Sequence, residues 1–351
     1  MLANVTHILP LTTIRRERVL PTAGRVVVRA AQKVAATDVI AEARLVTQHQ
    51  VLDVSRGLGV SPDQAEKYIT RKIGEDVSQG DVVAGPVGIF PRVIRTPKDG
   101  RVVAIGGGQV LIELESRPFE LLAGIPGMVT DLIPDRGAIV ETTGALIQGI
   151  WGNGQIDSGV LVALAQTADE ELTAERFDVS MRGSILLGGT CTQADTLHAA
   201  AQVPLRGLVL GSMTGDLAPV ALQLKIPILV LEGFGKLPIN PAALKILTTN
   251  EKREIAVNAC VWNRLTGERP EVVIHLPAAG PLATPREADI FAPGQTVRIV
   301  RSPNSAAAGT LVALRPGQTT FPSGIRAPGA AVKLENGDQV VVPLANLEVV
   351  E

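Results

Sequence analysis

The spacing of hydrophobic positions divides the chain into regions with different predicted elements. From about residue 18 to residue 150, short runs of Val, Ile and Leu alternate with turns rich in Gly, Pro and Asp. Such runs at this density are typical of a β-barrel or sandwich. A helix is expected to interrupt them at 61–73, because Ser61 is a favourable N-cap, Pro62 falls at the first helical position and Gly74 can end the helix.

This first region contains an internal repeat. Residues 34–41 and 77–84 share the pattern V-x-x-[TG]-D-V-[IV]-A. A strand–turn–strand unit that occurs twice indicates two pseudo-symmetric halves with the helix between them. We therefore expect residues 18–157 to form one β module with a helical insert, preceded by an N-terminal segment at 1–17.

Residues 158–278 have a different period, in which continuous apolar strands alternate with helices. Three strands and three helices are predicted, at 184–189, 193–202, 205–211, 216–224, 226–231 and from 241. Thr192 is the expected cap of the first helix. The alternation predicts an α/β domain with a parallel sheet covered on both faces. A further strand at 272–276 is expected to close the sheet at an edge.

The C-terminal part returns to short strands. Residues 279–290 are expected to be a linker, because the stretch around them is rich in Pro, Ala and Gly. A small β module follows at 291–351, with strands predicted at 296–300, 309–314, 331–334 and 339–343. Asn336-Gly337 indicates a type I′ hairpin between the last two strands. The predicted fold class is thus multidomain β and α/β.

Composition and charge narrow the possible functions. The chain is 46% hydrophobic, 19% charged and only 3% aromatic, and its formal net charge is −2. It is too apolar to be disordered, and it lacks the overall basic excess that favours nucleic-acid binding. The two Cys and four His show no metal-binding spacing, so neither a metal nor a cofactor is expected. No signal peptide and no membrane-spanning run is evident, which predicts a cytoplasmic protein without membrane insertion.

The most promising candidate chemistry lies where the predicted parallel strands end. Ligands of open α/β sheets bind beyond the carboxyl ends of the strands, and small polar residues before helices can hold an anion. The alternative is that these residues are ordinary turn and cap residues. The candidate ligand-binding residues are Gly189, Thr190, Cys191, Thr192, Gly211, Ser212, Thr214, Asp216 and Glu232.

Other candidate motifs are weaker. Cys191 could pair with His198 as a nucleophile and base, although buried and unactivated Cys is far commoner. Glu232-Gly-Phe-Gly-Lys-Leu237 lacks the first Gly and the hydroxyl residue of a phosphate-binding loop. Arg15-Arg-Glu-Arg18 is expected to be a solvated segment, because basic interaction tails are usually longer.

Two motifs of the first region resemble the barrel-sandwich hybrid fold of biotinyl and lipoyl domains. They are Gly80-Asp-Val-Val-Ala84 and Thr96-Pro-Lys-Asp-Gly-Arg-Val-Val-Ala-Ile105, and the resemblance covers roughly residues 18–150. Carrier domains of that family present a modified Lys in a context such as Met-Lys-Met or Asp-Lys-Ala. Neither triplet occurs here, and Lys98 lies in a Pro-Lys-Asp-Gly turn. The resemblance therefore implies the fold without the carrier activity.

The last region resembles a KOW/SH3-like barrel in Gly294-Gln-Thr-Val-Arg-Ile-Val300, Pro303 and Gly309-Thr-Leu-Val312. Members of that family contact RNA or protein through their loops. Base stacking needs aromatic side chains, and this module offers only Phe291 and Phe321. The resemblance therefore implies protein contact, and the candidate partner-binding residues are Arg298, Arg301 and Asn304.

Residues 208–229 resemble the phosphohistidine swivelling domain of phosphoenolpyruvate-utilising enzymes. The order of strand, Gly-rich turn, helix and Leu-x-Ile-Pro carries this resemblance. Ala218 occupies the position of the phosphorylated His, so the resemblance implies a non-catalytic relative.

The sequence lacks a carrier Lys, the phosphorylated His, a phosphate-binding loop and metal-binding spacing. These missing motifs favour a non-enzymatic adaptor or scaffold protein. Its β modules would bind other protein chains, in a larger assembly or as a homo-oligomer. One alternative is a small-ligand-binding protein or enzyme that uses the strand-end loops of the α/β domain. Another is an RNA- or ribosome-associated protein that uses the KOW-like barrel. The charge balance and the scarcity of aromatic residues do not favour nucleic acid.

Overall fold

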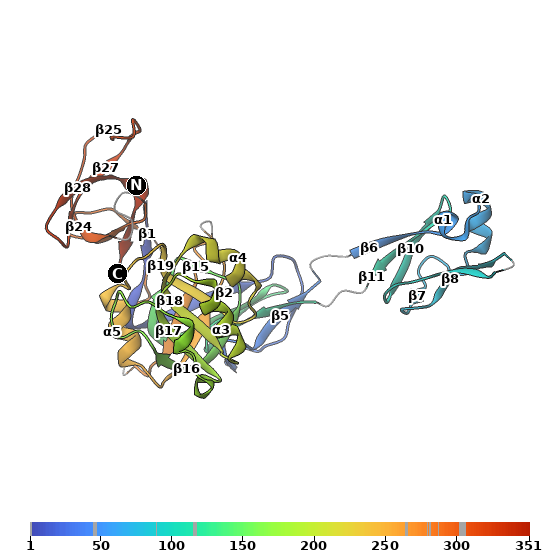
Figure 1. Cartoon of the computed structure of the whole chain (residues 1–351), viewed down its shortest axis with the longest axis horizontal. Helices are drawn as coiled ribbons and strands as arrows, with labels where there is room; N and C mark the ends of the chain where they lie inside the picture. Colours follow the sequence, from blue (N-terminus) through green and yellow to red (C-terminus); the bar gives the residue numbers. More distant parts are fainter. Residues whose placement is uncertain are drawn as a thin grey trace.

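The computed structural model describes residues 2–44, 48–88, 90–114, 118–263, 266–278, 280, 282–286, 288–301 and 307–351. Strands account for 47% of the described residues and helices for 14%. The strands form several sheets (Figure 1). The expected β-rich organisation is confirmed. Among the described residues, no helix is both long enough and apolar enough to span a membrane.

The largest sheet has 11 strands and forms the middle of the molecule in Figure 1. Its order is β15-β19-β18-β17-β16-β20-β21-β14-β13-β4, and β2 also pairs with β14. The strands are β15 (Trp151–Gly152), β19 (Ile228–Phe234), β18 (Gly207–Met213), β17 (Ser184–Cys191), β16 (Ile156–Ala163), β20 (Glu254–Asn258), β21 (Glu271–His275), β14 (Gly137–Gln148), β13 (Gly127–Ile133), β4 (Lys33–Val34) and β2 (Ile8–Val19).

Strands β16 to β19 are parallel neighbours, and helices cover both of their faces. The helices are α3 (Ala194–Gln202), α4 (Ala218–Gln223) and α5 (Pro241–Thr249). Because successive strand residues point to opposite faces, Leu187 packs in one core with Leu247 of α5. Leu186 packs in the other core with Leu197 of α3. The predicted strand and helix positions are confirmed, but Thr192 is not the cap of α3, because Gln193 takes that position.

The long strand β14 connects two regions that the sequence separates. Its first half pairs with β13, and its second half pairs with β21, while β2 follows it on the other side. The regions predicted as 18–157 and 158–278 therefore share one sheet. Strand β21 is not an edge strand as expected, because it lies between β14 and β20.

The internal repeat found in the sequence is also a structural repeat. In each copy an Asp carboxylate accepts a hydrogen bond from the backbone N–H three residues earlier, Asp38 from Ala35 at 2.8 Å and Asp81 from Ser78 at 3.2 Å. The first copy leads into a sheet in the order β12 (Phe119–Leu122), β5 (Val39–Ala43), β3 (Arg25–Val26). The second copy lies in the segment 48–114.

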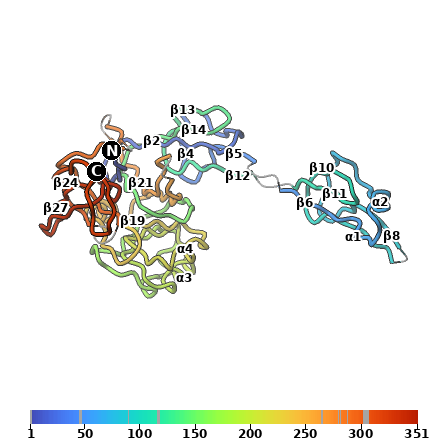
Figure 2. Tube along the Cα trace, turned by 90° about the horizontal axis from the view of Figure 1, so that it is seen from above, coloured from blue at the N-terminus to red at the C-terminus, as the bar shows by residue number. Residues whose placement is uncertain are grey.

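Residues 48–114 form a separate body with its own hydrophobic core, at the right of Figure 1 and of Figure 2. Its strands are β6 (Gln48–Asp53), β7 (Asp76–Val77), β8 (Val82–Val87), β9 (Arg92–Arg95), β10 (Gly100–Gly106) and β11 (Gln109–Leu114). The helix predicted at 61–73 is wrong in length. Helices α1 (Val54–Leu58) and α2 (Pro62–Ala65) are short, and one 3₁₀ turn follows α2. The chain then extends because Ile69 forms a β-bridge with Ala84.

The C-terminal sheet has seven strands and includes the start of the chain. Its order is β22-β1-β29-β23-β24-β27-β28. The strands are β22 (Ala288–Ile290), β1 (Leu2–Thr6), β29 (Leu347–Val350), β23 (Thr296–Ile299), β24 (Ala308–Leu314), β27 (Gly329–Leu334) and β28 (Gln339–Pro343); β25 (Thr319–Thr320) and β26 (Arg326–Ala327) form a separate pair. The N-terminal segment therefore divides between two sheets, because β2 joins the large one. The Asn336-Gly337 turn is not type I′, since only Gly337 has a positive φ.

Candidate functional site

The predicted strand-end residues lie side by side, but their polar atoms bond to one another and to the backbone. The Ser212 hydroxyl is fully buried, donates to the Leu237 carbonyl at 2.9 Å and accepts from the Leu237 N–H at 3.1 Å. Because the Ser212 hydroxyl proton is donated to the Leu237 carbonyl, the Thr190 hydroxyl is the donor in its 2.9 Å hydrogen bond with Ser212. These groups stabilise the turn after β19 and leave little capacity for a ligand.

Neighbouring segments also cover these strand ends. A Cβ on Gly189 would lie 1.7 Å from the Glu170 carbonyl, and one on Gly211 would lie 2.3 Å from Ile239. Thr192 donates to Glu171, which also pairs with Lys236 at 3.5 Å. Thr214 keeps one buried hydroxyl without a partner in the described structure, and Asp216 is exposed. The strand ends therefore resemble a closed turn region more than an open ligand groove.

The candidate nucleophile Cys191 is buried. Its side chain is 0% exposed, and its Sγ contacts the Gln193 carbonyl at 3.7 Å. Burial raises the pKa of the Cys191 thiol to about 11, and a neighbouring carboxylate, Glu171, contributes in the same direction. His198 lies exposed on α3, and no hydrogen bond joins it to Cys191 among the described residues. The surroundings of Cys191 do not activate it.

Cys191 is therefore expected to stay unmodified when the native protein is treated with iodoacetamide near neutral pH, because only the thiolate reacts. With a pKa of about 11, a very small fraction of this thiol is ionised under those conditions. Peptide mass spectrometry should find alkylated Cys191 only after denaturation. Stoichiometric labelling of the folded protein would contradict the assignment of Cys191 as a core residue.

Glu232 and Arg298, predicted for two different kinds of site, meet in one buried ionic cluster. Arg298 of β23 donates from Nη1 to Glu232 at 2.6 Å and from Nε to Glu348 at 2.6 Å. Glu348 of β29 also accepts from Arg269 at 3.2 Å and from Thr6 at 3.0 Å. The four charged side chains are each at most 6% exposed. We call Thr6, Glu232, Arg269, Arg298 and Glu348 the junction cluster, because it joins the C-terminal sheet to the large sheet.

The charges of the junction cluster stabilise one another. Burial alone would raise the pKa of Glu348, but Arg298 and Arg269 outweigh it and hold that pKa below its ordinary value. Burial would likewise lower the pKa of Arg298, and Glu348 and Glu232 reverse this effect. Glu348 and Arg298 are therefore both charged at neutral pH. Arg298 faces these carboxylates, so its guanidinium is not presented to a partner.

The other two candidate partner residues have different positions. Arg301 is exposed and lines a cavity of about 290 Å³ beside the junction cluster, together with Phe234 and Trp262. Asn304 lies outside the described residues. Sequence reasoning did not find Thr6, Arg269 or Glu348, because their partners are distant in sequence.

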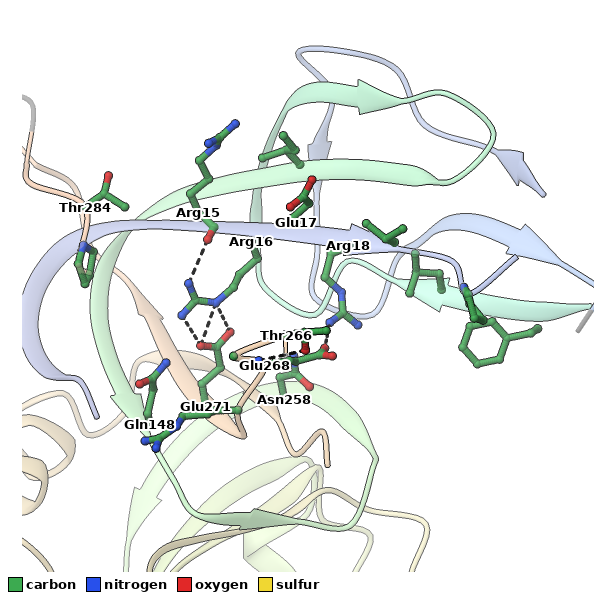
Figure 3. Close-up of a pocket in the computed structure, with 18 residues that line it drawn as sticks. Arg15, Arg16, Glu17, Arg18, Gln148, Asn258, Thr266, Glu268, Glu271 and Thr284 are labelled. Atoms are coloured by element: carbon green, nitrogen blue, oxygen red, sulfur yellow. Dashed lines mark hydrogen bonds and ion pairs between the residues drawn. The ribbon is translucent and has the colours of Figure 1, made fainter. Parts of the chain in front are cut away.

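A larger cavity of about 710 Å³ lies beside β2 and contains part of the predicted basic run (Figure 3). We call it the arginine cavity, and its walls include Arg16, Arg18, Gln148, Asn258, Glu268 and Glu271. Because strand residues alternate, Arg16 and Arg18 share one face of β2. Arg16 makes paired hydrogen bonds to Glu271 at 2.6 and 2.9 Å, and Arg18 bonds to Glu268. The expectation of a solvated segment is therefore wrong for Arg16 and Arg18, which are 23% and 11% exposed.

No cluster of His, Cys, Asp and Glu able to hold a metal ion occurs in the part of the chain that the structure describes. In comparisons with known proteins, no protein family and no curated protein matches this sequence.

Proposed function

We propose that this protein is a non-enzymatic adaptor that binds other protein chains through its β modules. The observation that supports this most directly is the separate body at 48–114. It carries a hairpin, β8–β9, whose tip exposes Phe90 to 87%. Burying this aromatic side chain against a partner would gain roughly 2–3 kcal/mol, which makes it a suitable anchor for protein binding.

The same proposal includes the finer fold assignments. The two matching Asp turns support a barrel-sandwich hybrid origin for the first region, with 48–114 inserted into it. The antiparallel order β29-β23-β24-β27-β28 supports a KOW/SH3-like module at the C-terminus. Both module types would serve an adaptor in a larger assembly or a homo-oligomer.

Two observations favour the adaptor over the other candidates. The strand-end loops satisfy most of their polar atoms internally, which weakens the small-ligand proposal at that place. Arg298 is 2% exposed, so this candidate partner-binding residue of the KOW-like barrel is accessible neither to RNA nor to a protein partner. The adaptor proposal depends on neither position.

Phe90→Ser is expected to abolish partner binding while leaving the melting temperature unchanged, because Phe90 contributes almost nothing to the folded core. The full chain and the variant are compared by quantitative affinity capture from the native host. A protein counts as a partner only if purified material reproduces the difference in affinity.

Val179→Ser is the matched control, since Val179 is a similarly exposed apolar residue, at 76%, outside the 48–114 body. It should retain every partner. Partners that bind Phe90→Ser as well as they bind the native chain would refute the role of the hairpin. A strictly monomeric protein that recovers no partner would refute the adaptor function itself.

A further inference from the structure

Strand β6 forms one edge of the four-stranded sheet in the 48–114 body. The sheet order is β6-β11-β10-β7, and among the described residues no strand pairs with the outer side of β6. Every second residue of an edge strand points its backbone N–H and C=O groups away from the sheet, where they can pair with another strand. The body stands apart from the two larger sheets in Figures 1 and 2, so a large partner can reach this edge.

The sequence of β6 does not protect this edge. Natural edge strands are usually kept from pairing by Lys, by Pro or by a short length. Strands β4, β7 and β15 end their sheets with two residues each, and the edge strand β28 contains Pro343. Strand β6 has six residues, Gln48-His-Gln-Val-Leu-Asp53, and contains no Lys, Arg or Pro. It is therefore able to accept another strand.

Three exposed side chains of β6 share one face of the sheet. Because strand residues alternate, His49, Val51 and Asp53 point to the same face, whereas Leu52 packs in the core of the body. Val51 is 54% exposed and lies opposite Leu111 of β11. This face of β6 therefore carries an apolar side chain in its middle, an imidazole at one end and a carboxylate at the other.

This order of side chains is complementary to itself. When two identical strands pair antiparallel about a two-fold axis, the axis passes through one residue, because outward-pointing backbone groups recur at every second residue. If that residue is Val51, it lies opposite Val51 of the second copy, and His49 of each copy lies opposite Asp53 of the other. A pair centred on Gln50 would instead place His49 opposite Val51.

The charges at both ends favour the register centred on Val51. Asp53 is exposed, and its Oδ1 accepts the Arg56 backbone N–H at 2.9 Å and the Ser55 hydroxyl at 2.8 Å, which hold the pKa of Asp53 below its ordinary value. These recorded bonds use only Oδ1, so Oδ2 can face a second copy. His49 already lies opposite Glu113 of β11 and would then lie between two carboxylates. Opposite charges across strands stabilise a sheet, and like charges destabilise it.

We propose that β6 pairs with β6 of a second copy of this chain, antiparallel and centred on Val51. The pair joins two four-stranded sheets into one continuous sheet and places the exposed Val51 side chains against each other. The proposal specifies how the adaptor forms a homo-oligomer and in that respect rests on the proposed function, but its contacts do not include Phe90.

Sedimentation velocity of the full chain tests the pairing. A short edge contact predicts a weak dimer, so the native chain should change from monomer to dimer as its concentration rises through the micromolar range. Val51→Lys should raise the dimer dissociation constant at least about tenfold, because two like charges would meet at the axis. Its melting temperature should stay unchanged, since Val51 is largely exposed. Ile290→Lys is the matched control on the edge strand β22, where Ile290 is 63% exposed, and it should dimerise like the native chain.

Disulfide trapping tests the register. Residues directly opposite in antiparallel strands have Cα atoms about 4.5–5.5 Å apart, a separation that a disulfide can span. Val51→Cys should therefore form a covalent dimer under mild oxidation. His49→Cys should not, because its two copies lie roughly 13 Å apart in this register.

A chain that is monomeric at every concentration would overturn the proposal, as would a dimer that Val51→Lys does not weaken. Cross-linking of His49→Cys as readily as of Val51→Cys would overturn the register. A monomeric chain whose partner is still lost in Phe90→Ser would refute the β6 pairing alone and leave the adaptor function standing.

Discussion

Replacing Arg298 by Met is expected to lower the free energy of unfolding by about 3–5 kcal/mol, the usual cost of removing one partner from a buried ion pair. Arg298 is the only residue that contacts both Glu232 and Glu348 among the described members of the junction cluster. Without it, Glu232 keeps only the Asn240 backbone N–H as a recorded donor, at 2.9 Å. Glu348 would keep Arg269, but Glu232, only 6% exposed, would lose its ion pair.

Urea unfolding of the native chain and of Arg298→Met measures this loss. Arg301→Met is the control, because Arg301 is exposed, and it should change stability by less than about 0.5 kcal/mol. A loss below about 1 kcal/mol in Arg298→Met would show that the ion pairs do not form in solution.

The pH dependence of this loss in the free energy of unfolding provides a second measurement. The folded-state pKa of Glu348 lies below its ordinary value, so its contribution is fully present above that ordinary value and disappears as pH falls through the folded-state pKa. The difference between the native chain and Arg298→Met should therefore shrink in acid. A difference that stays constant from neutral pH to well below the ordinary carboxyl pKa of about 4.3 would contradict an electrostatic origin.

Val5→Asp is expected to cost more than about 3 kcal/mol and to disorder the C-terminal sheet in particular, because it buries an unpaired charge. Val5 is 3% exposed and packs in one core with Val297 and Val349. Strand β1 lies between β22 and β29, so its loss separates β22 from the remaining strands.

Hydrogen exchange measured by mass spectrometry locates this effect. Peptides from β23 and β29 should lose protection in Val5→Asp, whereas peptides from β17 and β18 should keep it. Leu2→Asp is a matched control on the same strand, since Leu2 is 71% exposed. Equal loss of protection in both variants, or in neither, would contradict the assignment of β1 to the C-terminal core.

The sequence predicted those strands and helices whose hydrophobic pattern and end signals lie within one short stretch of the chain. Strands β17, β18 and β19 are continuous apolar runs buried on both faces, and the helices between them have recognisable ends. Strands β1 and β2 were not predicted, because the first 17 residues show no sustained alternation and their partners lie far away. Nothing within Gly137–Gln148 indicates that one strand serves two regions.

The candidate site residues were harder to predict for the same reason. Glu232 was selected as a strand-end ligand residue and Arg298 as a partner residue, and only tertiary packing reveals that they neutralise each other.

The pairing of β1 with β29 has a consequence for synthesis of the chain. Val5 pairs with Val349, so β1 emerges from the ribosome about 340 residues before its partner exists. At roughly 5–20 residues per second, that interval is on the order of tens of seconds. Throughout it, Ala3 and Val5 lack the core that later covers them. The nascent chain must therefore keep an apolar strand from aggregating until β29 has been synthesised, a requirement that a ribosome-bound chaperone would meet.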